Sequence, residues 1–189
     1  MRNFPIDARP PLEQNLVVTA GAVPQGVHEE VQQAARTDAL TGLLNHGAMQ
    51  VRLREEIARA QRDGTVLSCV ILDLDDFKRV NDSRGHQAGD ELLRGVADLL
   101  RAELRPYDQV ARYGGDEFVL LATALSSPSG LELIGERVLA ALGDGFAVNG
   151  NALAVTASVG GVFVEDPTAD PDDVLHRADA AMYAAKHTR

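Results

Sequence analysis

The chain has 189 residues, of which 45% are hydrophobic and 24% charged, a balance that is typical of a folded protein and excludes disorder throughout. Its formal net charge of −10 argues against sequence-independent binding to a nucleic acid polymer, which needs a surface of Lys and Arg. The single cysteine, Cys69, excludes an intrachain disulfide, and no apolar run reaches the ~20 residues that cross a bilayer. We therefore expect a cytoplasmic protein without a membrane span.

Two parts are expected along the chain, with a boundary near residue 36. Residues 1–35 carry several prolines and glycines and predict a leader of low intrinsic order, which ends in a short helix that begins near residue 27. Such a short helix needs a neighbour to be stable, and a second chain could supply it, so this segment is a candidate for dimerisation. Residues 36–189 are predicted to form one domain.

Helix-length amphipathic stretches alternate with short apolar runs in this domain, which predicts an α/β or α+β fold. Two tight turns are indicated, one at Asn149 and Gly150 and one at Gly114 and Gly115. In chain order we expect a helix over 46–62, a strand over 65–75, a helix over 88–104, strands over 108–113 and 117–123, a helix over 129–142, a strand over 152–164 and a helix over 171–187.

Acidic residues gather at two of these strand ends. Asp73, Asp75 and Asp76 fall at the end of a buried strand, while Asp116 and Glu117 directly follow the glycine turn. Because buried carboxylates without partners are costly, and because Mg²⁺ prefers carboxylate, backbone and phosphate oxygens, the two places would form a metal site if they adjoin in space. The alternative is that these carboxylates are solvated strand caps and that the glycines form an ordinary turn.

A polar stretch over 78–90 follows the acidic strand and carries a cation, an amide and a carboxylate in Lys78, Asn81 and Asp90. A lysine can meet phosphate oxygens as a point charge, and an amide with a carboxylate matches the edge of guanine. Gly114 and Gly115 lack side chains, so backbone amides there could approach a phosphate. The alternative for residues 78–90 is a solvated loop.

These residues form a known pattern, since RYGGDEF at 112–118 resembles the signature of the GGDEF family of diguanylate cyclases. Further matching blocks occur in the family's order: DALTGLLN at 38–45, DLDDFKRVND at 73–82, GHQAGDELL at 85–93 and ADAAMYAAK at 178–186. The resemblance covers residues 36–189. It implies a fold similar to the adenylyl cyclase and polymerase palm, with a central, mostly antiparallel sheet flanked by helices and the signature on a β-hairpin.

The resemblance also implies an activity, the condensation of two GTP molecules into cyclic di-GMP with loss of two pyrophosphates. Each domain would hold one GTP, so a homodimer is implied, with Mg²⁺ or Mn²⁺ as cofactor and two ions for each GTP. The residues carried over by motif are Asp73, Asp116 and the Leu74 carbonyl as metal ligands, Gly114, Gly115 and Glu117 as the rest of the catalytic turn, Asn81 and Asp90 as guanine ligands, and Lys78 and Lys186 as phosphate ligands.

Upstream of the turn, Arg105 and Asp108 match the family's RxxD inhibitory motif. The resemblance implies a site for cyclic di-GMP that gives product feedback, whereas the plain alternative is an Arg that ends a helix and an Asp that caps a strand. Two positions depart from the family pattern: His46 stands in place of the usual Arg, and Arg189 falls one place early for a phosphate contact. An alternative function is a catalytically inactive module that binds GTP or cyclic di-GMP; a dimerisation switch is another.

Overall fold

The computed structural model describes residues 35–123, 125, 127–166 and 168–188. The predicted leader, apart from residue 35, and Arg189 lie outside these residues. The elements are α2 (His46–Asp63), β1 (Leu67–Leu74), α3 (Phe77–Arg84), α4 (His86–Glu103), β2 (Gln109–Arg112), β3 (Glu117–Thr123), α5 (Pro128–Gly143), β4 (Phe146–Val148), β5 (Asn151–Leu153), β6 (Ala157–Val164) and α6 (Pro171–His187).

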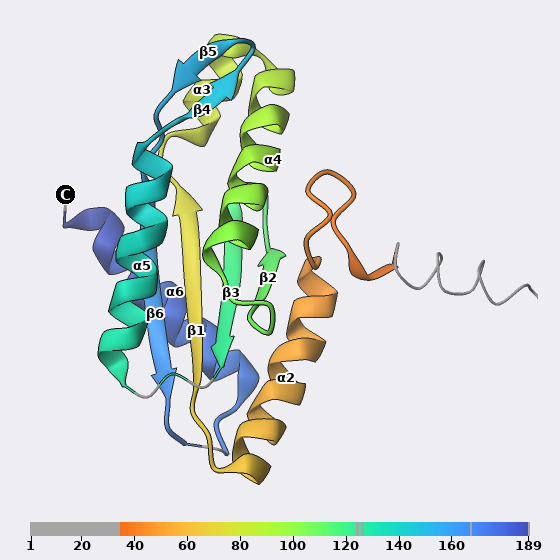
Figure 1. The fold of residues 1–189 in the computed structure, drawn as a ribbon, viewed down its shortest axis with the longest axis vertical. Helices are drawn as coiled ribbons and strands as arrows, with labels where there is room; N and C mark the ends of the chain where they lie inside the picture. The colour runs from red at the N-terminus through yellow and green to blue at the C-terminus, as the bar shows by residue number, and fades with distance from the viewer. Residues whose placement is uncertain (1–34, 124, 126, 167, 189) are drawn as a thin grey trace, which may run out of the picture.

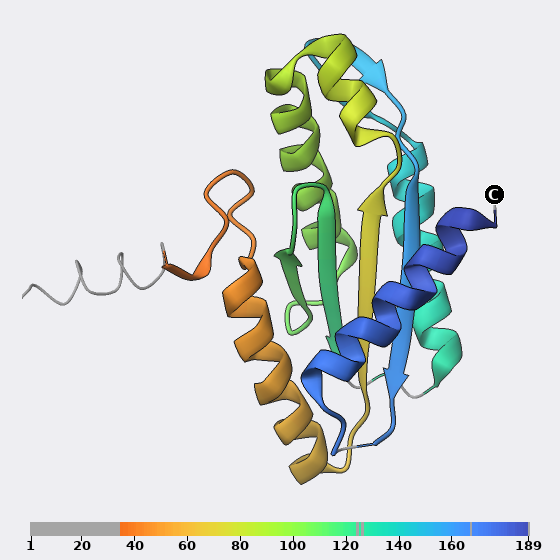
Figure 2. The same cartoon turned by 180° about the vertical axis from the view of Figure 1, so that it is seen from behind.

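A four-stranded antiparallel sheet in the order β2-β3-β1-β6 forms the middle layer. Helices α4 and α5 cover one face of the sheet, and α2 and α6 cover the other (Figures 1 and 2). β1 is buried along its whole length, and its alternate side chains supply two hydrophobic clusters, one on each face. This arrangement confirms the predicted α/β class and the mostly antiparallel sheet flanked by helices.

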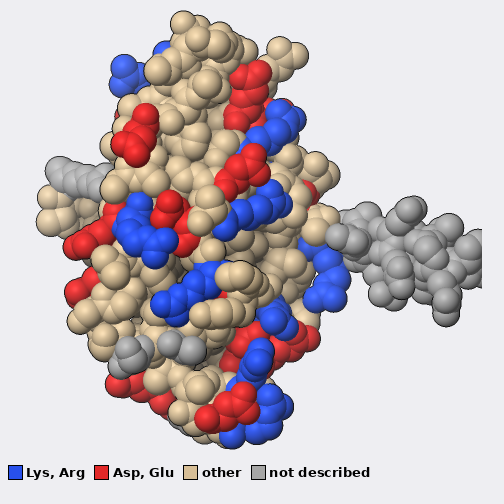
Figure 3. Space-filling model, in the orientation of Figure 1, with Lys and Arg blue, Asp and Glu red and all other residues tan. Residues whose placement is uncertain are grey.

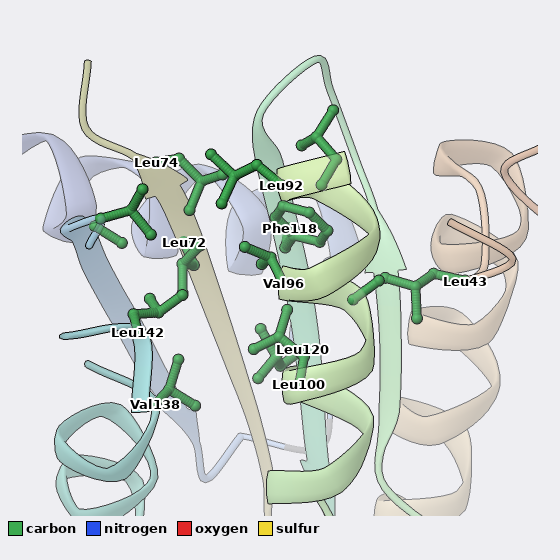
Figure 4. Packing of buried hydrophobic residues seen from close by; sticks show 14 of the residues in the cluster. Leu43, Leu72, Leu74, Leu92, Val96, Leu100, Phe118, Leu120, Val138 and Leu142 are labelled. Carbon is green, nitrogen blue, oxygen red and sulfur yellow. The ribbon is translucent and has the colours of Figure 1, made fainter. Parts of the chain in front are cut away.

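The cluster beneath α4 accounts for the apolar stripe of that helix. Leu92, Val96 and Leu100 are fully buried and lie against Leu72 of β1 and Phe118 of β3, as Figure 4 shows. A stripe at this spacing keeps one helix face against the sheet and turns the polar face outward. On the outer face of α4 and α5, acidic and basic side chains are interspersed rather than gathered into one basic surface (Figure 3).

Local sequence signals set several helix ends as predicted. Asn45 caps α2, because its side-chain oxygen accepts a hydrogen bond of 2.9 Å from the Ala48 amide. Asp170 caps α6 through a 2.8 Å bond from the Asp172 amide, with Pro171 in the first turn. None of the helices in the described ranges has the length and apolarity that a membrane span requires.

Two expectations about the elements were wrong in part. The polar stretch after β1 is mostly helical: α3 has no buried residue, so no apolar stripe marks it in the sequence, and α4 begins at His86 instead of residue 88. The run over 152–164 is two strands rather than one. β5 pairs only with β4 through the predicted turn, in which Asn149 and Gly150 have φ of 51° and 73°, and β6 then enters the main sheet.

Candidate active site

The end of β1 brings the two predicted acidic places together. Asp73 lies opposite Glu117 of β3 on one side and Ser158 of β6 on the other. The Leu74 amide donates to the Asp116 carbonyl over 3.2 Å, so the glycine turn is joined to the same strand end. Asp75 is also held there, because its carboxylate accepts a 2.8 Å bond from Ser158 Oγ. The sheet register therefore places Asp73, Leu74 and Asp116 beside one another.

A lysine from the far end of the chain completes this cluster. Lys186 lies in the last turn of α6, which crosses β1 and β6 on the face seen in Figure 2. Its Nζ is 2.6 Å from Oδ1 of Asp73, a residue that is only 8% exposed. The hydrogen bond to Asp73 raises the pKa of Lys186 above its ordinary value, and Asp116 and Asp75 add to this effect, so the side chain is an ammonium ion at neutral pH.

The remaining carboxylates experience an excess of negative charge. Burial and, next to it, the charge of Asp73 raise the pKa of Asp116 above its ordinary value. The pKa of Glu117 is raised by burial, then by Asp73 and Asp116, with a further contribution from Asp179. One ammonium therefore does not balance the acidic groups at this edge, and a further cation would be stabilised there.

The donor set fits a hard divalent ion. Carboxylate oxygens of Asp73 and Asp116 and the carbonyl of Leu74 are the oxygen ligands that Mg²⁺ takes from a protein. Within the described ranges, no group of three or more His, Cys, Asp or Glu side chains is arranged to hold a metal alone. Mg²⁺ commonly completes its octahedron with water and substrate phosphates, so two carboxylates are a sufficient protein contribution.

The glycine turn between β2 and β3 is held from outside by residues to which sequence reasoning gave no role. The Arg112 guanidinium donates to the Gly115 carbonyl from Nη2 (2.8 Å) and Nε (3.1 Å), and its Nη1 pairs with Asp38 at 3.3 Å. Partial burial raises the pKa of Asp38. Hydrogen bonds from Thr41 and the charge of Arg112 outweigh this effect, so the pKa of Asp38 is lowered overall. The matching blocks at 38–45 and 112–118 were the available signal for this link.

Glu117 and His46 shape the same turn. A side chain at Gly114 would meet the Glu117 carboxylate, so the absence of a Cβ at this position leaves room for that carboxylate. The His46 ring lies 4.2 Å from the ring of Tyr113, centroid to centroid. The departure from the family pattern at residue 46 thus contributes a ring contact behind the turn, at the start of α2.

The predicted guanine ligands lie on two helices that pack against each other, Asn81 on α3 and Asp90 on α4. The Asn81 amide lies so close to the backbone of Gly89 that a Cβ there would collide with it, and Asp90 is the next residue. Lys78 is exposed on α3, one turn before Asn81, and forms no ion pair with any described residue. The structure therefore places Asn81 against the turn of α4 that carries Asp90 and leaves Lys78 on the adjacent surface.

The RxxD residues lie at the other end of the sheet. Asp108 accepts a 3.1 Å bond from the Arg105 amide and a 3.3 Å bond from the Thr123 amide, while the Arg105 side chain is exposed. Thr123 ends the seven-residue β3 that Glu117 begins, so roughly 20 Å of strand separates the motif from the acidic cluster. Asp108 thus also caps a turn, as the plain alternative expects. Arg137, on the helix α5, is paired instead with Glu103 of α4 at 2.8 Å.

Comparisons with known proteins identify the family to which this fold and site belong. The family model described as "Diguanylate cyclase, GGDEF domain" matches residues 35–189, and the chain therefore belongs to the GGDEF-domain family of diguanylate cyclases. Among curated proteins it is 45% identical over 159 residues to diguanylate cyclase DgcP of Pseudomonas aeruginosa, a match that covers 84% of this chain and 23% of DgcP. It is 36% identical to the cyclic di-GMP phosphodiesterase NbdA of the same organism, covering 84% of this chain and 20% of NbdA.

Solved structures of the same family are also similar to this chain. The coiled coil and GGDEF domain of DgcB from Caulobacter crescentus, in complex with c-di-GMP, superposes with a TM-score of 0.81 at 32% identity and 87% coverage of both chains. Diguanylate cyclase SiaD of Pseudomonas aeruginosa, in complex with its activator SiaC, gives 0.78 at 37% identity, with 87% of this chain and 63% of SiaD covered. The chain thus spans only about a quarter or less of DgcP and NbdA but nearly the whole of the DgcB fragment.

Proposed function

We propose that the domain is a diguanylate cyclase that condenses two GTP molecules into cyclic di-GMP and releases two pyrophosphates. The observation that carries this proposal is the convergence of Asp73 and Asp116 beside Lys186, at the turn that bears the family signature. A pair of fixed carboxylates next to an ammonium suits a substrate that carries a triphosphate with a divalent ion.

The reaction is a pair of in-line displacements at phosphorus. The 3′ oxygen of each GTP forms a bond to the α-phosphorus of the other, the bond from that phosphorus to the α,β-bridging oxygen breaks, and pyrophosphate leaves with the electron pair. The 3′ hydroxyl proton passes to water. Two such steps close the ring, so two GTP give one cyclic di-GMP and two pyrophosphates.

The chain's own residues bind and orient the substrate in this scheme. Asp73, Asp116 and the Leu74 carbonyl would hold Mg²⁺ or Mn²⁺, two ions for each GTP, which when bound offset charge on the phosphates and lower the pKa of the hydroxyl. Lys186 and Lys78 would contact phosphate oxygens. In a further set of contacts, Asn81 and Asp90 would pair with the guanine edge, and the Gly114 and Gly115 backbone would approach the triphosphate.

Two domains must face each other, because each one holds a single GTP and both 3′ hydroxyls have to reach the opposite α-phosphorus. We therefore expect catalysis by a homodimer, and specific activity that rises with protein concentration until dimers saturate. Measuring the initial rate across a dilution series, alongside the dimer fraction by sedimentation, tests this. A rate per molecule that stays constant well below the dimer dissociation constant would contradict the half-site scheme.

The activity itself is tested by incubating the full chain with GTP and Mg²⁺ and measuring pyrophosphate and cyclic di-GMP. Release of pyrophosphate that is lost in Asp116→Ala, with the circular dichroism spectrum unchanged, is the expected result. GTP binding without turnover in the wild type would instead support a regulatory module that binds nucleotide and makes nothing. The similarity to NbdA, which is named a phosphodiesterase, is the observation that favours this second candidate.

We also propose that Arg105 and Asp108 bind cyclic di-GMP and limit its synthesis. The exposed Arg105 guanidinium could pair with phosphate or guanine, and relatives such as DgcB are known in complex with c-di-GMP. Arg105→Ala should raise the final yield of product while the initial rate stays similar. Product inhibition of the same strength in wild type and variant would exclude this site.

A cytoplasmic setting suits the reduced thiol of Cys69, which is buried.

A further inference from the structure

The ion pair between Lys186 and Asp73 puts a cation where the proposed function requires a metal ion. Nζ of Lys186 lies 2.6 Å from Oδ1 of Asp73, at hydrogen-bonding distance. A divalent ion bound by the same oxygen would compete with the ammonium for it, because two cations so close together repel each other. The charge of Asp73 is thus already partly neutralised by the chain itself.

The two partners differ in their freedom to move. The Asp73 side chain is 11% exposed and lies on a strand that is paired on both sides, to β3 and to β6. The Lys186 side chain is 44% exposed and carries its ammonium on a flexible four-carbon stem. It comes from the last full turn of a helix that ends at His187. If the pair opens, Lys186 moves and Asp73 stays.

We propose that Lys186 pairs with Asp73 until the divalent ion and GTP bind together, and that its ammonium then moves to the nucleotide phosphates. This inference rests on the proposed function and adds a binding order to it. A metal ion alone breaks the ion pair and takes from Lys186 its hydrogen-bonded anion, so that only weaker interactions with neighbouring carboxylates such as Asp75 remain. A metal ion that arrives with a triphosphate provides that anion, so the displaced ammonium is paired again.

The exchange couples the two ligands thermodynamically. Nucleotide tightens metal binding, and by linkage the metal tightens nucleotide binding by the same factor. Loss of the ammonium should then have opposite effects on the two ligands. A metal ion alone would bind more tightly because nothing competes for Asp73, whereas the nucleotide would bind more weakly because a phosphate contact is lost. A lysine that served only as a phosphate ligand would leave metal binding without nucleotide unchanged.

The test measures Mn²⁺ binding to the full chain without nucleotide, by the loss of the free-ion signal in electron paramagnetic resonance. Lys186→Ala is expected to tighten Mn²⁺ binding about ten-fold, the factor that corresponds to about 1.4 kcal/mol, which is the scale of one charge-assisted hydrogen bond. Binding of 3′-deoxy-GTP, which lacks the nucleophilic hydroxyl and is not turned over, should weaken in the same variant. Lys186→Met, which keeps the length of the stem without its charge, should behave alike.

Arg177→Ala is the matched control, because it removes one positive charge from the same helix. Arg177 is exposed and pairs only loosely with Asp173, at 3.7 Å, so its loss should leave Mn²⁺ affinity unchanged. Lys186→Arg, which retains the charge, should not tighten Mn²⁺ binding as Lys186→Ala does. If Lys186→Ala and Arg177→Ala change Mn²⁺ affinity equally, or if Lys186→Ala weakens it, the exchange is refuted.

Failure of the exchange differs from failure of the proposed function. Wild type that binds 3′-deoxy-GTP with Mn²⁺ but shows no tightening in Lys186→Ala refutes only the exchange. Wild type that binds Mn²⁺ in the presence of 3′-deoxy-GTP no better than Asp73→Ala does has no metal site at this edge, and that result overturns both. Tightening in Lys186→Ala without any cyclic di-GMP production would support the exchange in an inactive binding module.

Discussion

Gly160 of β6 is the position where the close contact between the sheet and α6 can be tested most sharply. A Cβ at Gly160 would lie 2.6 Å from the Ala178 carbonyl oxygen and from the Ala181 carbonyl carbon, and nearer still to the Met182 amide nitrogen. All three are backbone atoms of α6, so no side chain can rotate away to make room. Gly160→Ala therefore has to displace the helix from the sheet.

The cost follows from these distances. Overpacking a well-packed core costs about 1–3 kcal/mol, and because α6 must move as a unit we expect roughly 3 kcal/mol of lost stability for Gly160→Ala. For a domain of this size each kcal/mol lowers the melting temperature by about 2–4 °C, which gives a decrease of roughly 6–12 °C. The same shift would move Lys186 away from Asp73, so nucleotide-free Mn²⁺ binding should change as well.

The adjacent Gly161 supplies the control, because it points to the opposite face of the sheet. A Cβ there would come within 3.1 Å of Leu131, but the contact is with the end of a flexible side chain. Gly161→Ala is expected to change stability by less than about 1 kcal/mol, since alanine also loses less backbone entropy than glycine in a strand. Urea denaturation of both variants decides the matter, and equal midpoints for the two would refute the packing argument.

Three further perturbations test the charges and the core. Burial and the charge of Asp73 raise the pKa of Asp116 from its ordinary value of 3.8, so ionisation of Asp116 destabilises the metal-free domain. Asp116→Asn should therefore melt above the wild type at pH 7 in chelating buffer, and this difference should vanish below pH 3.8. The pKa of Asp38 is lowered instead, so its contribution is complete above pH 3.8 and lost as the pH falls further. Asp38→Asn should accordingly cost about 1–3 kcal/mol at pH 7 in urea denaturation, and this cost should decrease as the pH is lowered below 3.8. Leu100→Ala, at a fully buried position of α4, should cost about 3–5 kcal/mol by the same measurement.

Local signals made much of the fold predictable. The stripe of α4 and the caps Asn45 and Asp170 act within a few residues of where they stand, so the sequence alone shows them. α3 escaped prediction because none of its side chains is fully buried and only Phe77 and Val80 pack partly against the core, so its apolar period is too short to mark a helix. The break between β5 and β6 likewise depends on partners elsewhere, since β5 pairs with β4 and β6 pairs with β1.

The candidate site was predictable in its residue types and less so in its contacts. The strand-end position of Asp73 and the glycine turn are visible in the sequence, but their proximity depends on the antiparallel register of β1 and β3. The contact between Asp73 and Lys186 joins residues 113 positions apart, and no local pattern indicates it. Arg112 and Asp38 lie within the matching blocks, yet only the fold shows that they hold the turn.

The placement of charge in this fold explains how a chain with a net charge of −10 can be a candidate for binding a polyanion. The carboxylates that matter lie where the sheet holds them still, Asp73 at the end of β1 and Asp116 in the turn anchored by Arg112. The lysines lie on helices, Lys186 near the end of α6 and Lys78 on the exposed side of α3. Fixed anions define where a divalent ion would be held, and flexible cations can follow the phosphates that accompany it. The local arrangement of charge, and not its sum, therefore decides which ligand this edge of the sheet can bind.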